Sequence, residues 1–227
     1  MADLIDSIIS SASTPVEHDA LWVSTGSTII NLACSGRPHD GFRTGRIYNV
    51  VGGSGSGKSF LALSMLAEAS RNTQFDGYKL VYDDAEAANN FDMCKLFGQD
   101  TTDRLLLDSP AVPSDHVEDF FYNVNRMLFA DVPFIYVLDS LDSLTTDAEL
   151  NKTEEVLEVR AEGKKTTGSY NMQKAKMMSE MFRQVNSKLS HTKSMILIVS
   201  QIRDNINPMS YQKHTRAGGK ALQSVTL

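Results

Sequence analysis

The chain has 227 residues, 41% hydrophobic and 22% charged, with a formal net charge of −6. This composition supports the packed core of one α/β domain, excludes a disordered chain and argues against nucleic-acid binding by overall charge alone. No apolar run of about 18 residues predicts a transmembrane helix, and the acidic start at Asp3 and Asp6 is unlike a signal peptide. Cys34 and Cys94 lack metal-ligand spacing, so we interpret both as reduced packing residues of a cytoplasmic protein.

The predicted elements alternate between helices and apolar strands. Periodicity predicts helices over residues 3–13, around 28–33, and over 60–70, 87–97, 115–129 and 171–189, with Ser114 as the N-cap of the fifth. Apolar β-type runs predict strands at 46–51, 79–83, 105–107, 134–138 and 195–199, with another beginning at 225–227. Such alternation is typical of a mostly parallel sheet with helices on both faces, so the expected fold class is α/β. Because the last strand would stop at Leu227, we expect the natural protein to continue beyond it.

Residues 52–59 match the pattern G-x-x-x-x-G-K-[ST] between an expected strand and an expected helix. Glycines let backbone N–H groups surround phosphates, and the helix N-terminus adds partial positive charge. We therefore predict a nucleotide site in which Lys58 contacts the β- and γ-phosphates and the Ser59 hydroxyl binds Mg²⁺. The predicted nucleotide-binding residues are Gly52, Gly53, Ser54, Gly55, Ser56, Gly57, Lys58, Ser59 and Phe60. The alternative is a glycine-rich turn that binds no anion.

Acidic residues follow two of the expected strands. Asp139 would emerge at the carboxyl edge of the sheet, where it can hold Mg²⁺ through water; alternatively, it N-caps the next helix. Hydrolysis needs a carboxylate to orient the attacking water, and Glu86 is well placed for this if strand 79–83 neighbours strand 46–51. Alternatively, Asp83, Asp84 and Glu86 form a solvated loop or a helix start.

The second half of the chain has patterned charge. Residues 142–159 are strongly acidic, whereas residues 160–176 and 203–220 are basic. Basic runs are usually solvated loops, but they also bind nucleic-acid backbones. The methionines at 172, 177, 178 and 181 are interpreted as core filling of the predicted helix.

Five segments in this order resemble bacterial RecA and its phage relatives. They are Val23–Ser27 through Gly45–Ile47, the phosphate loop, Asp84-Ala85-Glu86, Leu138-Asp139-Ser140, and Val199–Arg203 followed by Gly218–Leu222. The resemblance covers roughly residues 22 to 227. It implies a RecA-like P-loop NTPase core that uses ATP and Mg²⁺.

The resemblance also implies roles for single residues. Glu86 is the expected catalytic base, and Gln201 is expected to sense the γ-phosphate and relay its presence to residues 202–217. Asn90 is the expected adenine contact, whereas Met93 stands where a base-stacking aromatic is expected. The first DNA-binding loop falls within about 150–168 and the second within about 203–217. The expected DNA contacts are Lys164, Lys165, Arg203, Tyr211, Lys213 and Arg216. A mixture of cations and an aromatic ring can bind a single strand, although Tyr211 alternatively packs within its loop.

These expectations combine into one organisation. Residues 1–20 form a helical segment for oligomerisation, and residues 21–227 form an ATPase core that is truncated at its C-terminal end. The expected function is that of a DNA-dependent ATPase and recombinase, which binds single-stranded DNA, assembles into a helical filament of identical copies and binds no membrane. A ring motor or helicase is the enzyme alternative, but no arginine finger or linker domain is identifiable. A recombination mediator that uses ATP as a switch is the non-enzyme alternative, and the set Glu86, Lys58 and Gln201 argues against it.

Overall fold

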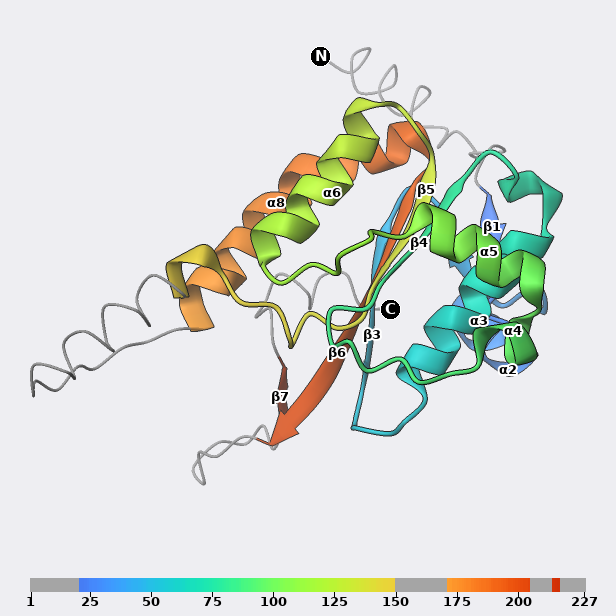
Figure 1. Ribbon diagram of the computed structural model, residues 1–227, viewed down its shortest axis with the longest axis horizontal. Helices are drawn as coiled ribbons and strands as arrows, with labels where there is room; N and C mark the ends of the chain where they lie inside the picture. Colours follow the sequence, from blue (N-terminus) through green and yellow to red (C-terminus); the bar gives the residue numbers. More distant parts are fainter. Residues whose placement is uncertain (1–20, 150–170, 205–213, 217–227) are drawn as a thin grey trace, which may run out of the picture.

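The computed structural model describes residues 21–149, 171–204 and 214–216, so the elements predicted at 3–13 and 225–227 lie outside these ranges. A four-stranded parallel sheet forms the centre of the molecule (Figure 1). Its strand order is β3 (Ile47–Gly52), β6 (Met195–Asp204), β5 (Phe134–Leu138) and β4 (Lys79–Asp83). A short strand, β7 (His214–Arg216), pairs antiparallel with the end of β6. The predicted α/β class with a mostly parallel sheet is confirmed.

Helices cover both faces of the sheet (Figure 1). On one face lie α6 (Val117–Phe129) and α8 (Asn171–Thr192), and on the other lie α3 (Lys58–Arg71), α4 (Met93–Phe97) and α5 (Gln99–Asp108). Residues of β5 alternate between two apolar clusters, because Phe134, Tyr136 and Leu138 pack with α6 and α8 whereas Ile135 and Val137 pack with α3. All five are buried, which explains why this strand is continuously apolar.

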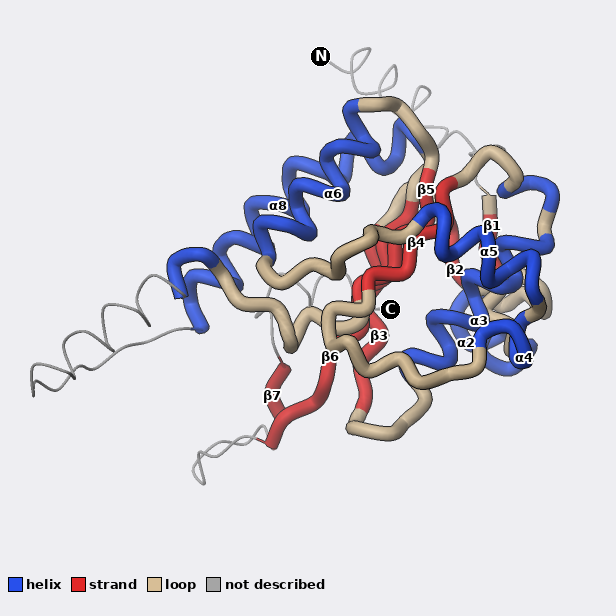
Figure 2. The backbone as a smooth tube through the Cα atoms, in the orientation of Figure 1, coloured by secondary structure: helices blue, strands red, loops and turns tan. Residues whose placement is uncertain are grey.

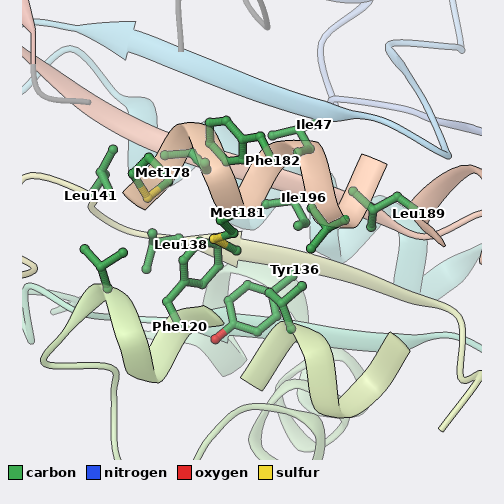
Figure 3. Packing of buried hydrophobic residues seen from close by; sticks show 14 of the residues in the cluster. Ile47, Phe120, Tyr136, Leu138, Leu141, Met178, Met181, Phe182, Leu189 and Ile196 are labelled. Atoms are coloured by element: carbon green, nitrogen blue, oxygen red, sulfur yellow. The ribbon is translucent and has the colours of Figure 1, made fainter. Parts of the chain in front are cut away.

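Figure 3 shows the core between the sheet and the α6–α8 pair. Phe120 of α6 lies against Tyr136 of β5, with 5.4 Å between ring centroids. Met178 and Met181 of α8 are buried in the same cluster, which confirms the prediction that they fill the core. Within the described ranges, no helix is both long and apolar enough to cross a lipid bilayer.

A small second sheet precedes the main one. β1 (Trp22–Val23) pairs antiparallel with β2 (Phe42–Arg43), and α2 (Thr28–Ser35) lies between them in the chain. The side chain of Ser27 caps α2 by accepting the N–H of Ile30, and Gly36 ends the helix with a φ of 73°. The helix predicted around 28–33 is therefore confirmed.

The strand predicted at 105–107 is wrong, because these residues belong to α5. Leu105 is buried and the next two leucines are exposed, so the run is part of an amphipathic helix. β4 therefore forms the edge of the sheet, and side chains pair with its backbone: Asp108 accepts the N–H of Leu80 and Ser109 accepts the N–H of Tyr82, both at 2.9 Å. A short 3-10 helix, η1 (Thr73–Phe75), lies between α3 and β4 in the chain.

Two predicted helices begin later than expected. The helix predicted over 87–97 is only α4 (Met93–Phe97), because the Asp84 carboxylate binds the N–H groups of Ala88 and Asn89 in the preceding loop and Asp92 caps the helix. The helix predicted over 115–129 begins at Val117 with His116 as its N-cap. Ser114 is not the cap, because its hydroxyl and N–H bind the buried carboxylate of Asp83 at 2.6 and 2.9 Å.

Candidate functional site

A glycine-rich loop joins β3 to α3 at the carboxyl edge of the sheet (Figure 2). Gly57 is the N-cap of α3 with a φ of 88°, a left-handed conformation that favours glycine. The Lys58 ammonium donates to the carbonyl oxygen of Gly53 at 2.7 Å, across the loop. A Cβ atom added at Gly53, Gly55 or Gly57 would meet nothing within 4 Å, so the loop faces open space. This geometry, with a helix N-terminus and a lysine beside the open space, suits an anion.

Asp139 follows β5 and lies beside the first turn of α3. Its carboxylate is buried, with 4% exposure, accepts a hydrogen bond from the Tyr82 phenol at 2.8 Å and lies close to the Ser59 hydroxyl. Burial raises the pKa of Asp139, and the nearby charges of Glu86 and Asp84 raise it further, whereas the neighbouring hydroxyl groups of Ser59 and Tyr82 oppose this rise. The peptide bond that follows Asp139 is cis. Residues 141–143 form a turn rather than a helix, so the N-cap alternative for Asp139 is wrong.

Glu86 lies near Asp139, but for a different reason from the one expected. β4 does not neighbour β3, because β6 and β5 lie between them. Instead, the loop after β4 folds over the end of β5: the Glu86 N–H donates to the Asp139 carbonyl at 3.2 Å, and the Ser140 hydroxyl donates to the Glu86 carboxylate. The alternative of a solvated acidic loop is wrong for Asp83, because its side chain is fully buried. The side chain of Glu86, in contrast, is exposed.

Gln201 lies in β6, in register with Gly52 at the end of the phosphate-loop strand. Its side-chain amide donates to the Glu86 carboxylate at 3.3 Å, and its backbone N–H donates to the Asp142 carboxylate at 2.7 Å. The structure therefore gathers the phosphate loop, Ser59, Glu86, Asp139 and Gln201 at one edge of the sheet, from segments far apart in the sequence.

The strand that carries Gln201 is longer than predicted. It was expected to end at residue 199, with a loop from about 203, but β6 continues to Asp204. The end of β6 and β7 form an antiparallel ribbon, in which Ile202 pairs with Arg216, Arg203 with Thr215 and Asp204 with His214. Two predicted DNA contacts, Arg203 and Arg216, therefore lie on neighbouring strands. The other four, Lys164, Lys165, Tyr211 and Lys213, lie outside the described residues.

Asn90 and Met93 lie before and after Phe91 in the sequence, and Phe91 forms an exposed aromatic pair with Phe60. Phe60, in the first turn of α3, contacts Phe91 with 6.0 Å between ring centroids, and both rings are exposed. Asn90 precedes Phe91 in the loop and is exposed. Met93 is partly buried against the core on the α3 side.

The structure adds polar residues that the sequence reasoning missed. Tyr82 binds Asp139, Ser140 binds Glu86, and Asp142 binds the Gln201 backbone. Lys174 of α8 also donates to the carbonyls of Leu141 and Leu144, at 2.6 and 2.5 Å, and so holds the turn that contains Asp142. Strand alternation could have identified Tyr82, which faces the same side as Leu80. No local signal distinguishes Lys174 from its neighbours.

The fold and loop define an α/β protein with a RecA-like core. The chain matches the RecA N-terminal domain family over residues 6–226, and it belongs to this family. It is similar to the plasmid protein RecA of Lactococcus lactis subsp. lactis, with 31% identity over 87% of this chain and 50% of that protein. It is also similar to protein RecA of Mesoplasma florum, with 28% identity over 92% of this chain and 55% of the relative. The chain thus spans about half the length of the curated relatives it matches.

Proposed function

We propose that this protein binds and hydrolyses ATP with Mg²⁺ and uses the bound nucleotide to control its binding of single-stranded DNA during homologous recombination. The filament of identical copies is part of the same proposal. Membership of the RecA N-terminal domain family supports it, as does the similarity to proteins named RecA. The observation that carries the proposal is the position of Gln201, between the end of the phosphate-loop strand, Glu86 and the β6–β7 ribbon.

The residues around the phosphate loop fit an ATP–magnesium complex. The open space before Gly53, Gly55 and Gly57 leaves room for phosphate oxygens, and Lys58 can exchange its carbonyl partner for a phosphate. The Ser59 hydroxyl and the Asp139 carboxylate lie close to each other, and both are hard oxygen donors of the kind that Mg²⁺ prefers. When bound, Mg²⁺ would neutralise charge on the phosphate oxygens.

Glu86 is the proposed general base for hydrolysis. Its side chain is exposed, so water can reach it, and the Ser140 hydroxyl and Gln201 amide hold one of its oxygens in a defined direction. Its other oxygen can accept a hydrogen bond from the attacking water. Gln201 can exchange its bond to Glu86 for one to the γ-phosphate, because an amide donates to either group.

The same amide connects hydrolysis with the proposed DNA-binding segment. Arg203 follows Gln201 by two residues in β6, and Arg216 lies on the paired strand β7. Because a paired ribbon moves as a unit, a shift at Gln201 reaches both arginines without first being absorbed by a flexible loop. Cations on a ribbon can bind phosphates of a single strand, with the predicted contacts Lys164, Lys165, Tyr211 and Lys213 adding to them.

ATP hydrolysis assays combined with electron microscopy, with and without single-stranded DNA, test the proposal. The wild-type chain should hydrolyse ATP faster with DNA and form filaments on it. Lys58→Ala should abolish hydrolysis because it removes the charge that contacts the β- and γ-phosphates. Lys95→Ala, at an exposed lysine on α4, is the matched control and should hydrolyse ATP normally. Normal turnover by the Lys58 variant would show that the phosphate-loop assignment is wrong.

A further inference from the structure

Tyr82 reaches from the edge strand of the sheet into the candidate magnesium site. Its phenol donates to one oxygen (Oδ2) of Asp139 at 2.8 Å, and the Ser59 hydroxyl lies beside the same carboxylate. The Tyr82 backbone N–H is held by the Ser109 hydroxyl, and the ring packs against the core beside α3. The backbone position of Tyr82 and the carboxylate that its phenol contacts are therefore both defined.

A second tyrosine–carboxylate pair lies nearby and provides a comparison. Tyr136 of β5 donates its phenol proton to the buried carboxylate of Asp83 at 2.5 Å, and Ser114 donates to the same carboxylate. The Asp83 carboxylate thus joins β4 and β5 to the segment before α6, while the Asp83 backbone carbonyl accepts the N–H of Asp139 at 2.9 Å. The phenol of this second pair therefore ends on a carboxylate that holds strands together, whereas the phenol of the first pair ends on the carboxylate beside Ser59.

We propose that Tyr82 is a positioning residue of the magnesium site. Its phenol holds the Asp139 carboxylate in the orientation in which the carboxylate faces Ser59. This inference rests on the proposed function, because it concerns the same magnesium site. A carboxylate with one donor fewer can rotate about its Cβ–Cγ bond, and a buried carboxylate has no water to replace the lost donor.

The effect should appear in the magnesium requirement of nucleotide binding. Groups that orient a metal ligand through a hydrogen bond typically change metal affinity by about 10- to 100-fold when they are removed. Tyr82→Phe removes only the hydroxyl and keeps the ring that packs against the core. The variant should therefore need roughly tenfold more Mg²⁺ for half-maximal binding of a fluorescent ATP analogue. Its affinity for the analogue in EDTA should equal that of the wild type, because the phosphate loop is unchanged.

Tyr136→Phe is the matched control, since it also removes one phenol–carboxylate hydrogen bond from a neighbouring strand. It should lower the melting temperature but leave the magnesium titration unchanged. Ser59→Ala, which removes a proposed metal ligand, should shift the titration at least as far as Tyr82→Phe.

The outcomes separate this inference from the proposed function. If the wild type needs Mg²⁺ and Tyr82→Phe shows the same half-saturation, or if Tyr136→Phe shifts it equally, Tyr82 does not position the metal site. If the wild type binds the nucleotide equally with Mg²⁺ and with EDTA, the proposed magnesium site itself is wrong, and the role of Tyr82 with it. A shift confined to the Tyr82 and Ser59 variants supports the inference.

Discussion

Glu86 receives hydrogen bonds from two segments that are distant in the sequence, the turn after β5 and the end of β6. Glu86→Gln preserves its shape and the oxygen that accepts these bonds, but it removes the base. We therefore expect hydrolysis to fall by about 100-fold or more while ATP binding persists. Steady-state kinetics and the affinity for an ATP analogue measure the two effects.

Glu180→Gln is the control for this variant. Glu180 is an exposed carboxylate on α8 that pairs with Lys176 at 4.0 Å, and its variant should hydrolyse ATP normally. A residual rate in Glu86→Gln above about one-tenth of the wild-type rate would point to a different base.

The predicted site residues differed in how far the sequence could locate them. The phosphate loop is a contiguous pattern, so its residues follow from local sequence. Asp139 and Gln201 follow from the rule that parallel strands end at one edge. The contacts of Glu86 depend on strand order, which no local pattern encodes. Tyr82 and Lys174 reach the site across the fold, so their partners could not be read from spacing.

At the scale of elements, α8 is tied to the turn after β5 by Lys174. The Lys174 ammonium binds the carbonyls of Leu141 and Leu144, on either side of Asp142, which in turn binds the Gln201 backbone. Lys174→Met keeps the apolar stem and removes these bonds, so the turn should loosen. We expect kcat to fall about 2- to 30-fold, the range for residues that couple sites without contacting ligands, with the KM for ATP largely unchanged.

Lys176→Met is the control on the same helix, because the Lys176 ammonium is exposed and pairs with the exposed Glu180 carboxylate at 4.0 Å. Lys174→Arg should restore part of the rate, since it supplies donors to the same carbonyls. Equal kcat values for Lys174→Met and the wild type would show that this tie does not influence hydrolysis.

The packing of α6 on the sheet should dominate the stability of its face. Phe120 is fully buried against Tyr136, so Phe120→Ala should lower the free energy of unfolding by about 3–5 kcal/mol. Tyr122→Ala, at a side chain with 63% exposure on the same helix, should change it by less than about 0.5 kcal/mol. Urea denaturation measures both, and similar losses would contradict the assignment of the core face.

Most elements could be predicted because their apolar pattern and their tertiary role agree. The buried strands β5 and β6 have continuous apolar runs that only a sheet covered on both faces explains. The strand prediction at residues 105–107 was wrong because three consecutive leucines also fit a helix in which only one of them is buried. Beyond residue 199, β6 continues by pairing with β3 at residues 200–201 and with β7 at residues 202–204. The β7 partners lie ten residues or more away in the chain, so the local sequence does not encode this pairing.

At the scale of the whole molecule, the proposal joins the nucleotide edge of the sheet to the β6–β7 ribbon. Arg203 and Arg216 lie on opposite strands of this ribbon, and Gln201 lies at its base. An effector shifts a two-state element only by its differential binding to the two states, so the γ-phosphate must change the partner of Gln201 to change DNA affinity. By linkage, DNA must favour the ATP-bound state by the same factor.

The most direct test compares the affinity for single-stranded DNA with an ATP analogue and with ADP, by fluorescence anisotropy. The wild-type protein should bind DNA about 5- to 150-fold more tightly with the ATP analogue, a typical coupling of about 1–3 kcal/mol. Gln201→Ala should retain its ATP affinity and bring that ratio close to one. Lys213→Ala combined with Arg216→Ala should instead weaken DNA binding with either nucleotide and reduce its salt dependence. Equal DNA affinities for the wild-type protein with both nucleotides would contradict nucleotide-gated DNA binding, and with it the proposed recombinase function.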